Sequence, residues 1–178
     1  MNPAAAAHDR QFCAWLGEHR GIFVKIARAY ASEPEDQRDL LQEMQLQVWR
    51  SLGSFRGQAQ PSTWIYRVCL NTALAWRRAE RRQPSSSADA PELPTEIPSD
   101  EGRPGHSHEK AELLLQLYAA IRQLAPAERS LVLLLLDGLS YREISEITGL
   151  TENHVGVALT RARGRLAEKL KGIRDELG

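Results

Sequence analysis

Residues 139–166, LSYREISEITGLTENHVGVALTRARGRL, decide how the fold of this chain is interpreted. They predict two helices joined at a glycine. Ser140 is placed to cap the first helix while Glu143 reaches back to the cap amide, and Gly149 is placed to end it. Thr151 is placed to cap the second helix. Two short helices joined by a glycine-containing turn form a helix-turn-helix, which presents its second helix to the major groove of DNA.

Hydrophobic spacing supports both helices. Ile144 and Ile147 form the apolar face of the first, and Leu150 is expected to fill the gap between the two. The second helix has apolar residues at a helical period: Val155, Leu159, Ala162, Leu166 and Leu170. Its basic residues suit contact with phosphates: Arg161, Arg163, Arg165, Lys169, Lys171 and Arg174. A solvated helical hairpin in an all-α domain is the competing interpretation of this segment alone.

The composition is that of an ordinary globular protein. The chain has 178 residues, of which 42% are hydrophobic, enough for one domain or two small ones. It has no run of about 18 apolar residues and no signal-peptide pattern, so we expect a cytoplasmic protein without a membrane span. Cys13 and Cys69 belong to no CxxC pattern and are expected to be small buried hydrophobes. We therefore expect no metal and no cofactor.

Charge divides the chain into three parts, although 23 basic and 23 acidic residues leave no net charge. Residues 1–83 hold 12 basic and 8 acidic residues, residues 84–110 hold 2 and 6, and residues 111–178 hold 9 of each. Zero net charge argues against nonspecific coating of nucleic acid by the whole molecule. Two lobes flanking an acidic strip are expected.

The N-terminal lobe is expected to begin after a disordered segment, residues 1–11. Phe12–Ala31 fits one helix or a broken pair. Ser32 and Glu35 form a possible capping box for a helix that runs to about Leu52.

An acidic stripe follows this helix, because Asp36, Asp39 and Glu43 are spaced three and four residues apart. A metal or acid–base site is one interpretation, but no His or Cys accompanies the carboxylates. A solvent-exposed face is favoured at this point, and a docking surface for a basic partner is the third option.

The segment from Gly53 to Pro61 is predicted to be a loop, because it holds two glycines and a proline. Phe55 and Arg56 lie in it. A large apolar ring in a loop usually folds back onto the core, so that interpretation is preferred for Phe55.

A third helix is predicted from a cap at Ser62 or Thr63, with the sequence TWIYRVCLNTALAWRRAERR. Its inner face is expected to hold Ile65, Val68, Cys69, Thr72 and Ala75 or Trp76. Aromatic rings, cations and an amide alternate on its other faces: Trp64, Tyr66, Arg67, Asn71, Arg77 and Arg78. Such a surface suits single-stranded nucleic acid, since rings stack on bases and guanidinium groups contact phosphates. Alternatively, Trp64 and Trp76 belong to the core and the terminal arginines complement the helix dipole, and the two interpretations are close.

Residues 84–109 are predicted to be a flexible acidic linker rich in Pro and Ser, in which His106 and His108 are solvent-exposed. Residues 110–178 then form a second domain. A helix from Glu109 and another from Pro126, ended by Asp137 and Gly138, precede the helix-turn-helix. The predicted fold is all-α, with a three-to-four-helix domain over residues 12–83 and a helix-turn-helix domain joined by the linker.

Taken together, these motifs resemble the bacterial sigma factors of the extracytoplasmic-function (ECF) type in the sigma-70 family. Residues matching region 2 of that family are Asp36, Asp39, Leu40, Gln42, Glu43, Val48-Trp49-Arg50, Phe55-Arg56-Gly57, Thr63-Trp64-Ile65-Tyr66-Arg67 and Asn71. Residues matching region 4 are Leu124, Pro126, Arg129, Gly138, Ser140, Glu143, Ile144, Gly149, Val155, Leu159, Arg161-Ala162-Arg163 and Leu166. The similarity covers about residues 12–83 and 110–172, in the family's order.

This resemblance implies a transcription initiation factor that makes core RNA polymerase promoter-specific and is not itself an enzyme. It implies that region 2 docks on the β′ coiled coil through Asp36, Asp39, Gln42 and Glu43, so the docking interpretation of the acidic stripe is now preferred. It also implies that the loop and third helix capture and open the minus-10 element through Phe55, Arg56, Trp64, Arg67, Asn71, Arg77 and Arg78. The acidic linker matches a family segment that threads the polymerase near the RNA path.

The resemblance implies that region 4 sits on the β flap and reads the minus-35 element. Here the sequence departs from the family, since Gly156, Val157 and Ala158 stand where relatives often carry arginine or serine, and none can make a bidentate base contact. Candidate minus-35 contacts are Asn153, His154, Thr160 and Arg161, with Tyr141, Arg142, Thr151 and Arg163 nearer the phosphates. An anti-sigma partner is expected by family analogy.

Two other functions compete with this hypothesis. A stand-alone helix-turn-helix regulator explains the C-terminal half but leaves the Trp-Tyr-Arg helix and the acidic stripe without a role. A degenerate sigma-like protein that acts by protein contact alone is favoured by the weak base-reading potential of residues 156–158.

Overall fold

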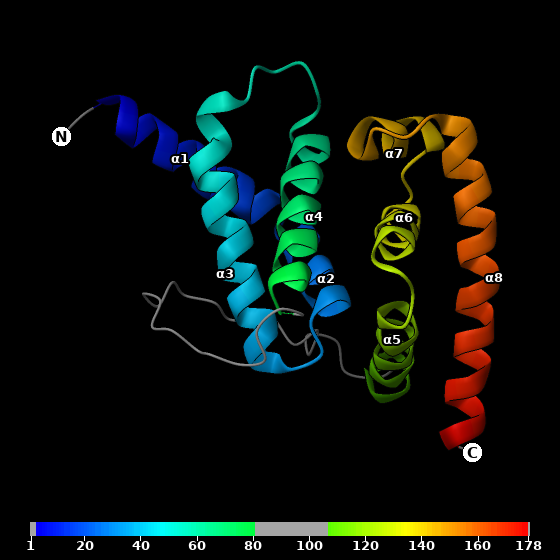
Figure 1. The fold of residues 1–178 in the computed structure, drawn as a ribbon. Coiled ribbons are helices and arrows are strands. Elements are labelled where there is room, and N and C mark those ends of the chain that lie inside the picture. Colours follow the sequence, from blue (N-terminus) through cyan, green and yellow to red (C-terminus); the bar gives the residue numbers. More distant parts are fainter. Residues whose placement is uncertain (1–2, 81–106, 178) are drawn as a thin grey trace. The chain divides into compact units, whose positions relative to one another are not determined.

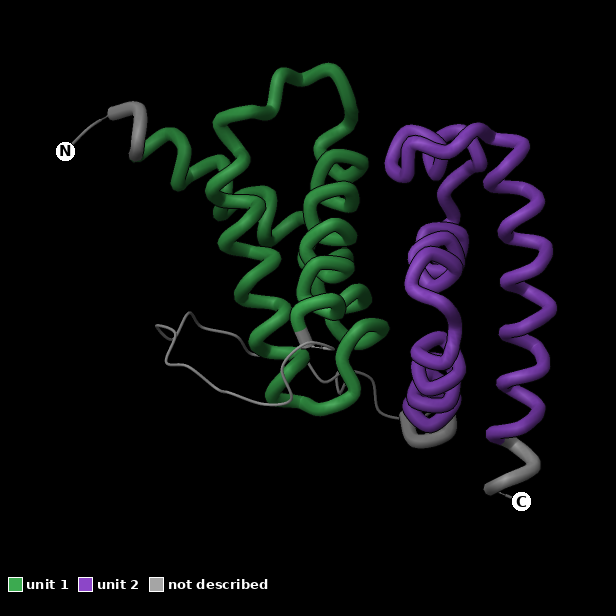
Figure 2. Tube along the Cα trace, viewed as in Figure 1, with its two compact units in different colours: residues 1–95 green, residues 96–178 purple. Residues whose placement is uncertain are grey.

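The computed structural model describes residues 3–80 and 107–177, which form eight α-helices, one short 3-10 helix and no strand (Figure 1). The chain divides into two compact units, Met1–Thr95 and Glu96–Gly178 (Figure 2). The prediction of an all-α chain with two small helical domains is therefore confirmed. The part of the predicted linker from residue 84 to 106, His106 included, lies outside the described residues.

Unit 1 is built from four helices and the 3-10 turn. Their bounds are α1 Pro3–Glu18, α2 Arg20–Tyr30, α3 Pro34–Ser51, η1 Leu52–Ser54 and α4 Pro61–Glu80. Helices α2, α3 and α4 pack against one another. Their contact buries large apolar side chains such as Phe23, Ile26, Leu40, Met44 and Ile65. This core holds α4, the predicted DNA-opening helix, from Thr63 to Ala73, the span of its buried residues.

The prediction of a disordered N-terminal segment is wrong, because helix α1 occupies most of it. Residues 3–11 are helical rather than disordered, and the chain breaks at His19 between α1 and α2, as the broken-pair alternative required. Trp49 of α3 donates its indole N–H to Asp9 over 3.1 Å, and the His8 ring lies edge-on to the same indole at 5.5 Å. These contacts join residues about 40 positions apart, so the local sequence contains no sign of them.

Two predicted helix starts are also corrected. Helix α3 has Glu33 at its N-cap with no side-chain cap bond, so the Ser32–Glu35 capping box is wrong. Helix α4 begins at Pro61, which places Ser62 and Thr63 inside its first turn. Proline suits this position because a helix's first amide has no intrahelical partner.

The buried stripe of α4 is wider than predicted. Ile65 and Cys69 are buried as expected, but Tyr66, predicted to face outward, is only 5% exposed, while Ala75 is exposed. Helices α2 and α3 both pack on α4, so more than one face is covered. Burial raises the pKa of the Cys69 thiol. Cys13, by contrast, is exposed, and the expectation that it is buried is wrong.

Unit 2 consists of α5 Ser107–Arg122, α6 Pro126–Leu136, α7 Tyr141–Thr148 and α8 Glu152–Leu177. Helix α8 packs against the other three. Helix α6 starts at Pro126 as predicted, and its C-cap is Asp137. Helix α5 starts two residues before the predicted Glu109. The guanidinium of Arg129, 3% exposed, donates to the carbonyl oxygens of Arg122 and Leu124 at 2.5 and 3.2 Å, which ties α6 to the end of α5.

The helix-turn-helix is present as predicted. The Ser140 amide and hydroxyl donate to the Glu143 carboxylate at 2.8 and 2.7 Å, and the Glu143 amide donates back to the hydroxyl at 3.3 Å. These hydrogen bonds hold the pKa of Glu143 below its usual range. Gly149 ends α7 with φ of 75°, a left-handed conformation that glycine adopts at little cost. Leu150 does not fill the gap between the helices, since it is 41% exposed.

Candidate nucleic-acid interface

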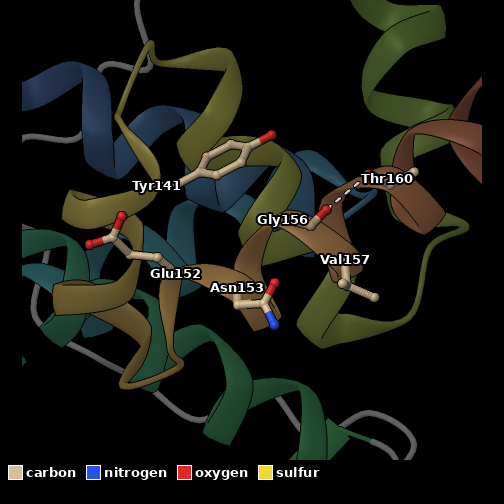
Figure 3. A pocket seen from close by; sticks show the side chains of 6 residues that line it. All are labelled: Tyr141, Glu152, Asn153, Gly156, Val157 and Thr160. Atoms are coloured by element: carbon tan, nitrogen blue, oxygen red, sulfur yellow. Dashed lines mark hydrogen bonds between the residues drawn. The ribbon is translucent and has the colours of Figure 1, made fainter.

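Helix α8 has a buried side and an open side. With about 100° of rotation per residue, Val155, Leu159 and Ala162 fall on one side, and all three are fully buried. The opposite side carries four residues at helical spacing: Asn153, Gly156, Val157 and Thr160. These four, with Glu152 and Tyr141, line an open hollow of about 500 Å³ (Figure 3). The part of α8 that a helix-turn-helix turns toward DNA is therefore a concave surface.

The ring of Tyr141 forms one wall of this hollow. A Cβ placed on Gly156 would lie 3.4 Å from the ring carbon Cε2, so the ring rests directly over the glycine (Figure 3). The Thr160 hydroxyl donates to the Gly156 carbonyl oxygen over 2.9 Å, within the same helix. The structure sets the ring of Tyr141, which is predicted to lie near the phosphates, on the open face of α8.

The other predicted minus-35 residues lie around this face. His154 and Arg161 are exposed along one flank of α8, and Arg163 is exposed on the other. The Thr151 hydroxyl accepts a hydrogen bond from the His154 amide at 3.3 Å, so Thr151 caps α8 as expected. Arg142, at the start of α7, is paired with Glu146 at 3.5 Å.

Arg165, further along α8, is tied to α6. Its guanidinium is hydrogen-bonded to the Glu128 carboxylate, and this contact raises the pKa of Arg165 above its ordinary value. The arginines of α8 thus differ, because Arg165 already has a carboxylate partner within its own unit.

In unit 1, three aromatic rings form a cluster at one end of α4. Trp15 of α1, Phe55 of the loop and Trp64 of α4 contact one another edge to face, with ring centroids 4.9, 5.6 and 5.9 Å apart. Phe55 therefore folds back on the domain, as the preferred interpretation required, yet all three side chains stay half-buried. For Trp15 the sequence predicted no more than a place in the helical stretch Phe12–Ala31. The sequence holds no signal that pairs it with the loop.

One face of α4 combines the cluster with polar groups. Arg67, Asn71 and Arg78 are exposed and share a face with Trp64, opposite the buried Tyr66 and Cys69. The structure thus brings most of the predicted opening residues together, and exposed Arg56 lies beside Phe55 in the loop.

Arg77 and Arg78 lie on different sides of α4. Arg77 falls on the opposite side of the helix from Trp64 and is half-buried, so it does not join the exposed face. Arg78 donates through Nε to the Leu74 carbonyl oxygen over 3.1 Å, a local contact that the helix-dipole interpretation also predicts.

The acidic stripe of α3 has the predicted spacing but is only partly open. Asp39 is exposed, while Asp36, Gln42 and Glu43 are half-buried. The Glu43 carboxylate accepts a hydrogen bond from the Gln47 side chain at 2.7 Å. Within residues 3–80 and 107–177, no group of three His, Cys, Asp or Glu side chains is arranged to hold a metal ion.

Two protein-family models match the chain: sigma-70 region 2 over residues 16–83, and sigma-70 region 4 over residues 114–166. The ECF RNA polymerase sigma-E factor of Escherichia coli K12 is 33% identical over 144 residues, which cover 78% of this chain and 75% of that protein. This chain is an ECF sigma factor of the sigma-70 family. The resemblance recognised from the residues is thereby confirmed, and the protein is a transcription initiation factor of a non-catalytic family.

This sigma factor also matches the ECF RNA polymerase sigma-E factor of Haemophilus influenzae, with 29% identity over 145 residues, 78% of this chain and 76% of that protein. CnrH, solved in complex with the cytosolic domain of CnrY, has a TM-score of 0.65 at 21% identity and covers 95% of both chains. RpoE of Bartonella quintana, solved with the anti-sigma factor NepR, has a TM-score of 0.60 at 20% identity and covers 92% and 96%. These two likenesses concern the fold.

No helix in the described part of this sigma factor has the length and apolar character that crossing a membrane requires.

Proposed function

We propose that this sigma factor binds core RNA polymerase in the cytoplasm and directs it to specific promoters, opening the minus-10 element with unit 1 and contacting the minus-35 element with unit 2. One observation carries the proposal. Each unit exposes a helix face suited to a different form of DNA: rings and cations on α4 for single strands, and a concave face on α8 for duplex.

Unit 1 acts on the melted non-template strand. Extruding a base from the duplex costs a few kcal/mol, and stacking on an aromatic ring returns about 1–3 kcal/mol per base. The half-buried rings of Phe55 and Trp64 supply the stacking surface. Exposed arginines on the loop and α4 then hold the phosphates, and Asn71 hydrogen-bonds to a base edge. Arg77 contributes at most indirectly, because it lies away from this face.

Polymerase docking is assigned to the acidic stripe. Asp36, Asp39, Gln42 and Glu43 follow one side of α3 and present carboxylates and an amide to the β′ coiled coil. Unit 2 binds the β flap. These two docks fix the spacing between the DNA-contacting faces once the factor is on the enzyme.

Unit 2 contacts the minus-35 duplex mostly at the phosphates of the DNA backbone. Asn153 can bond two edge atoms of an adenine, and His154 and Arg161 flank it. Thr151, Arg142 and Arg163 lie nearer the phosphates. Because phosphate contacts carry no base information, this arrangement positions the polymerase more than it selects the sequence.

An anti-sigma factor is the proposed regulatory partner. CnrH and RpoE, two solved proteins with a similar fold, were captured with the cytosolic domain of CnrY and the anti-sigma factor NepR, respectively. A co-purification of tagged protein from its host, followed by mass spectrometry of the bound chains, tests this part.

The main test is reconstitution with core polymerase on a library of duplex promoters. Transcripts that start at defined positions only when the factor is present are the expected result.

A variant with Asp39→Lys and Glu43→Lys should lose polymerase binding in an anisotropy titration while its circular dichroism is unchanged. Specific duplex binding without polymerase would instead support the stand-alone regulator. Polymerase or regulator binding with no specific transcript would support the protein-contact alternative.

A further inference from the structure

The open face of α8 is built around a glycine, which is unfavourable inside a helix because it adds backbone freedom and leaves a gap. Gly156 is the floor of the hollow, the Tyr141 ring is one wall, and Val157, 45% exposed, is the other (Figure 3). Tyr141 itself is 38% exposed. Two exposed apolar groups therefore lie on the face of α8 that is proposed to meet DNA, where polar base-reading side chains are expected. We call Tyr141, Gly156 and Val157 the apolar notch.

The chemistry of the major groove limits what this notch can recognise. Each base edge there presents hydrogen-bond donors and acceptors, and thymine alone adds an apolar group, its 5-methyl. Neither Gly156 nor Val157 has a side-chain donor or acceptor, so they cannot pair with the edge of guanine, cytosine or adenine. A valine methyl and an aromatic ring do provide an apolar contact for a methyl group.

We propose that the apolar notch binds the 5-methyl group of a thymine in the minus-35 element and that Val157 sets this specificity. The inference rests on the proposed contact of unit 2 with the minus-35 duplex. Asn153 lies one helical turn before Val157 on the same face of α8, and its amide bonds to an adenine next to that thymine. Residues 156–158 lack the arginine or serine that relatives often carry there. This difference changes which base α8 recognises, and α8 still recognises the DNA sequence.

Gly156 keeps the notch open. An added Cβ would stand 3.4 Å from the Tyr141 ring and would occupy the floor that the thymine methyl needs. Gly164, in the same helix, is a matched control because a Cβ added there meets nothing within 4 Å and the residue is outside the hollow.

The test uses the full-length factor with core polymerase and a promoter selected from the duplex library. Each thymine of the minus-35 element, on either strand, is replaced singly by uracil, which removes only the methyl group. We measure the affinity of the holoenzyme for each template. One replacement should weaken binding about three- to fourfold, the loss expected for one buried methyl. Thymine-to-uracil changes outside the element serve as the DNA control.

Protein variants assign the effect to the notch. With Val157→Ala, which keeps only one methyl, or with Gly156→Ala, the difference in affinity between thymine and uracil templates at that position should become smaller. Gly164→Ala should keep the wild-type difference, although it adds the same methyl to the same helix. Each variant is compared by its thymine-to-uracil ratio, so a general change in affinity does not affect the readout.

Several results would overturn the inference while leaving the proposed function intact. These are specific transcription with no uracil effect in the minus-35 element, a selected element without thymine, or a uracil effect of wild-type size in Val157→Ala. A library that yields no factor-dependent transcript would overturn the proposed function, and the inference with it.

Discussion

The candidate DNA-binding residues are packed together in unit 1 and line an open surface in unit 2. In unit 1 the rings of Phe55 and Trp64 already pack on each other and on Trp15, so an incoming base must compete with aromatic contacts of about 0.5–1.5 kcal/mol each. In unit 2 the open face of α8 is a hollow lined by α8 and by Tyr141 of α7, and hydrogen bonds between Ser140 and Glu143 cap α7. The difference suits the two substrates. Single strands can rearrange around a ring cluster, whereas a duplex needs a surface that is fixed beforehand.

The largest effect should come from Trp64→Ala. The variant loses a stacking surface of about 1–3 kcal/mol and two ring contacts. Open complexes on a duplex promoter should fall about 30- to 100-fold. On a template with a pre-melted minus-10 region the loss should be much smaller, as measured on both templates by the amount of run-off transcript. Trp64→Phe, which keeps a ring, should retain most activity. Equal losses on both templates would contradict the role in opening.

Trp15→Ala tests whether the cluster works as a unit. Removing Trp15 takes away two edge-to-face contacts, and the loop that holds Phe55 loses its support from α1. We expect about a tenfold loss of duplex opening, from about 1.4 kcal/mol of lost ring contact. Trp76→Ala is the control, since Trp76 is a half-buried tryptophan of the same unit that lies outside the cluster. If both variants behave alike, the loss reflects general destabilisation of unit 1 and not support of the opening loop.

Ser140→Ala should weaken unit 2 alone. Loss of the capping hydroxyl should lower the free energy of unfolding by about 1 kcal/mol. All four tryptophans, at positions 15, 49, 64 and 76, belong to unit 1, so tryptophan fluorescence in urea reports that unit and circular dichroism reports both. The fluorescence midpoint should stay while part of the dichroism transition moves to lower urea. A shift of both signals would show that the two units unfold together.

A smaller effect, on the salt dependence of DNA binding, is expected when two arginines of α8 are replaced one at a time. Arg163→Gln should reduce the slope of log affinity against log salt concentration by about one, because one phosphate contact is lost. Arg165→Gln should change the slope less, since that guanidinium is already engaged with Glu128. Titrations of holoenzyme on an upstream duplex at several salt concentrations measure both slopes. Equal changes would remove the distinction between the two residues.

The smallest predicted effect is a change with pH in the stability of unit 2. Hydrogen bonds from Ser140 hold the folded-state pKa of Glu143 below its unfolded value of about 4.3. The carboxylate therefore stabilises unit 2 fully above that unfolded value and loses this contribution as the pH falls through the folded pKa. The stability difference between wild type and Glu143→Gln, followed by circular dichroism, should shrink between pH 6 and about pH 3. A constant difference would mean that the charge of Glu143 is not involved.

Local signals in the sequence predicted most of the fold. The capping box at Ser140, the left-handed Gly149 and the start of α6 at Pro126 each depend on groups within a few residues, and all three are confirmed. The capping box at Ser32 failed although its pattern was similar, because α3 starts one residue later with Glu33 at the cap. A capping pattern shows only that a hydrogen bond is possible there.

The candidate site was predicted less completely. Helical spacing correctly grouped Trp64, Arg67 and Asn71, because one helix fixes their relative directions. It misplaced Tyr66, since the width of a buried stripe depends on how many neighbours a helix has, and α4 has two along its length. Sequence alone also left Trp15 without a role.

The sequence by itself determined the helices, their division into two domains and the sigma-factor family, because periodicity, capping and motif order are properties of neighbouring residues. Tertiary structure decided which rings meet and which face stays open. Trp15 reaches Phe55 and Trp64, and Tyr141 reaches Gly156, only when separate helices pack together. Such contacts depend on where whole elements lie in space, and that position results from the packing of the entire core rather than from any local pattern.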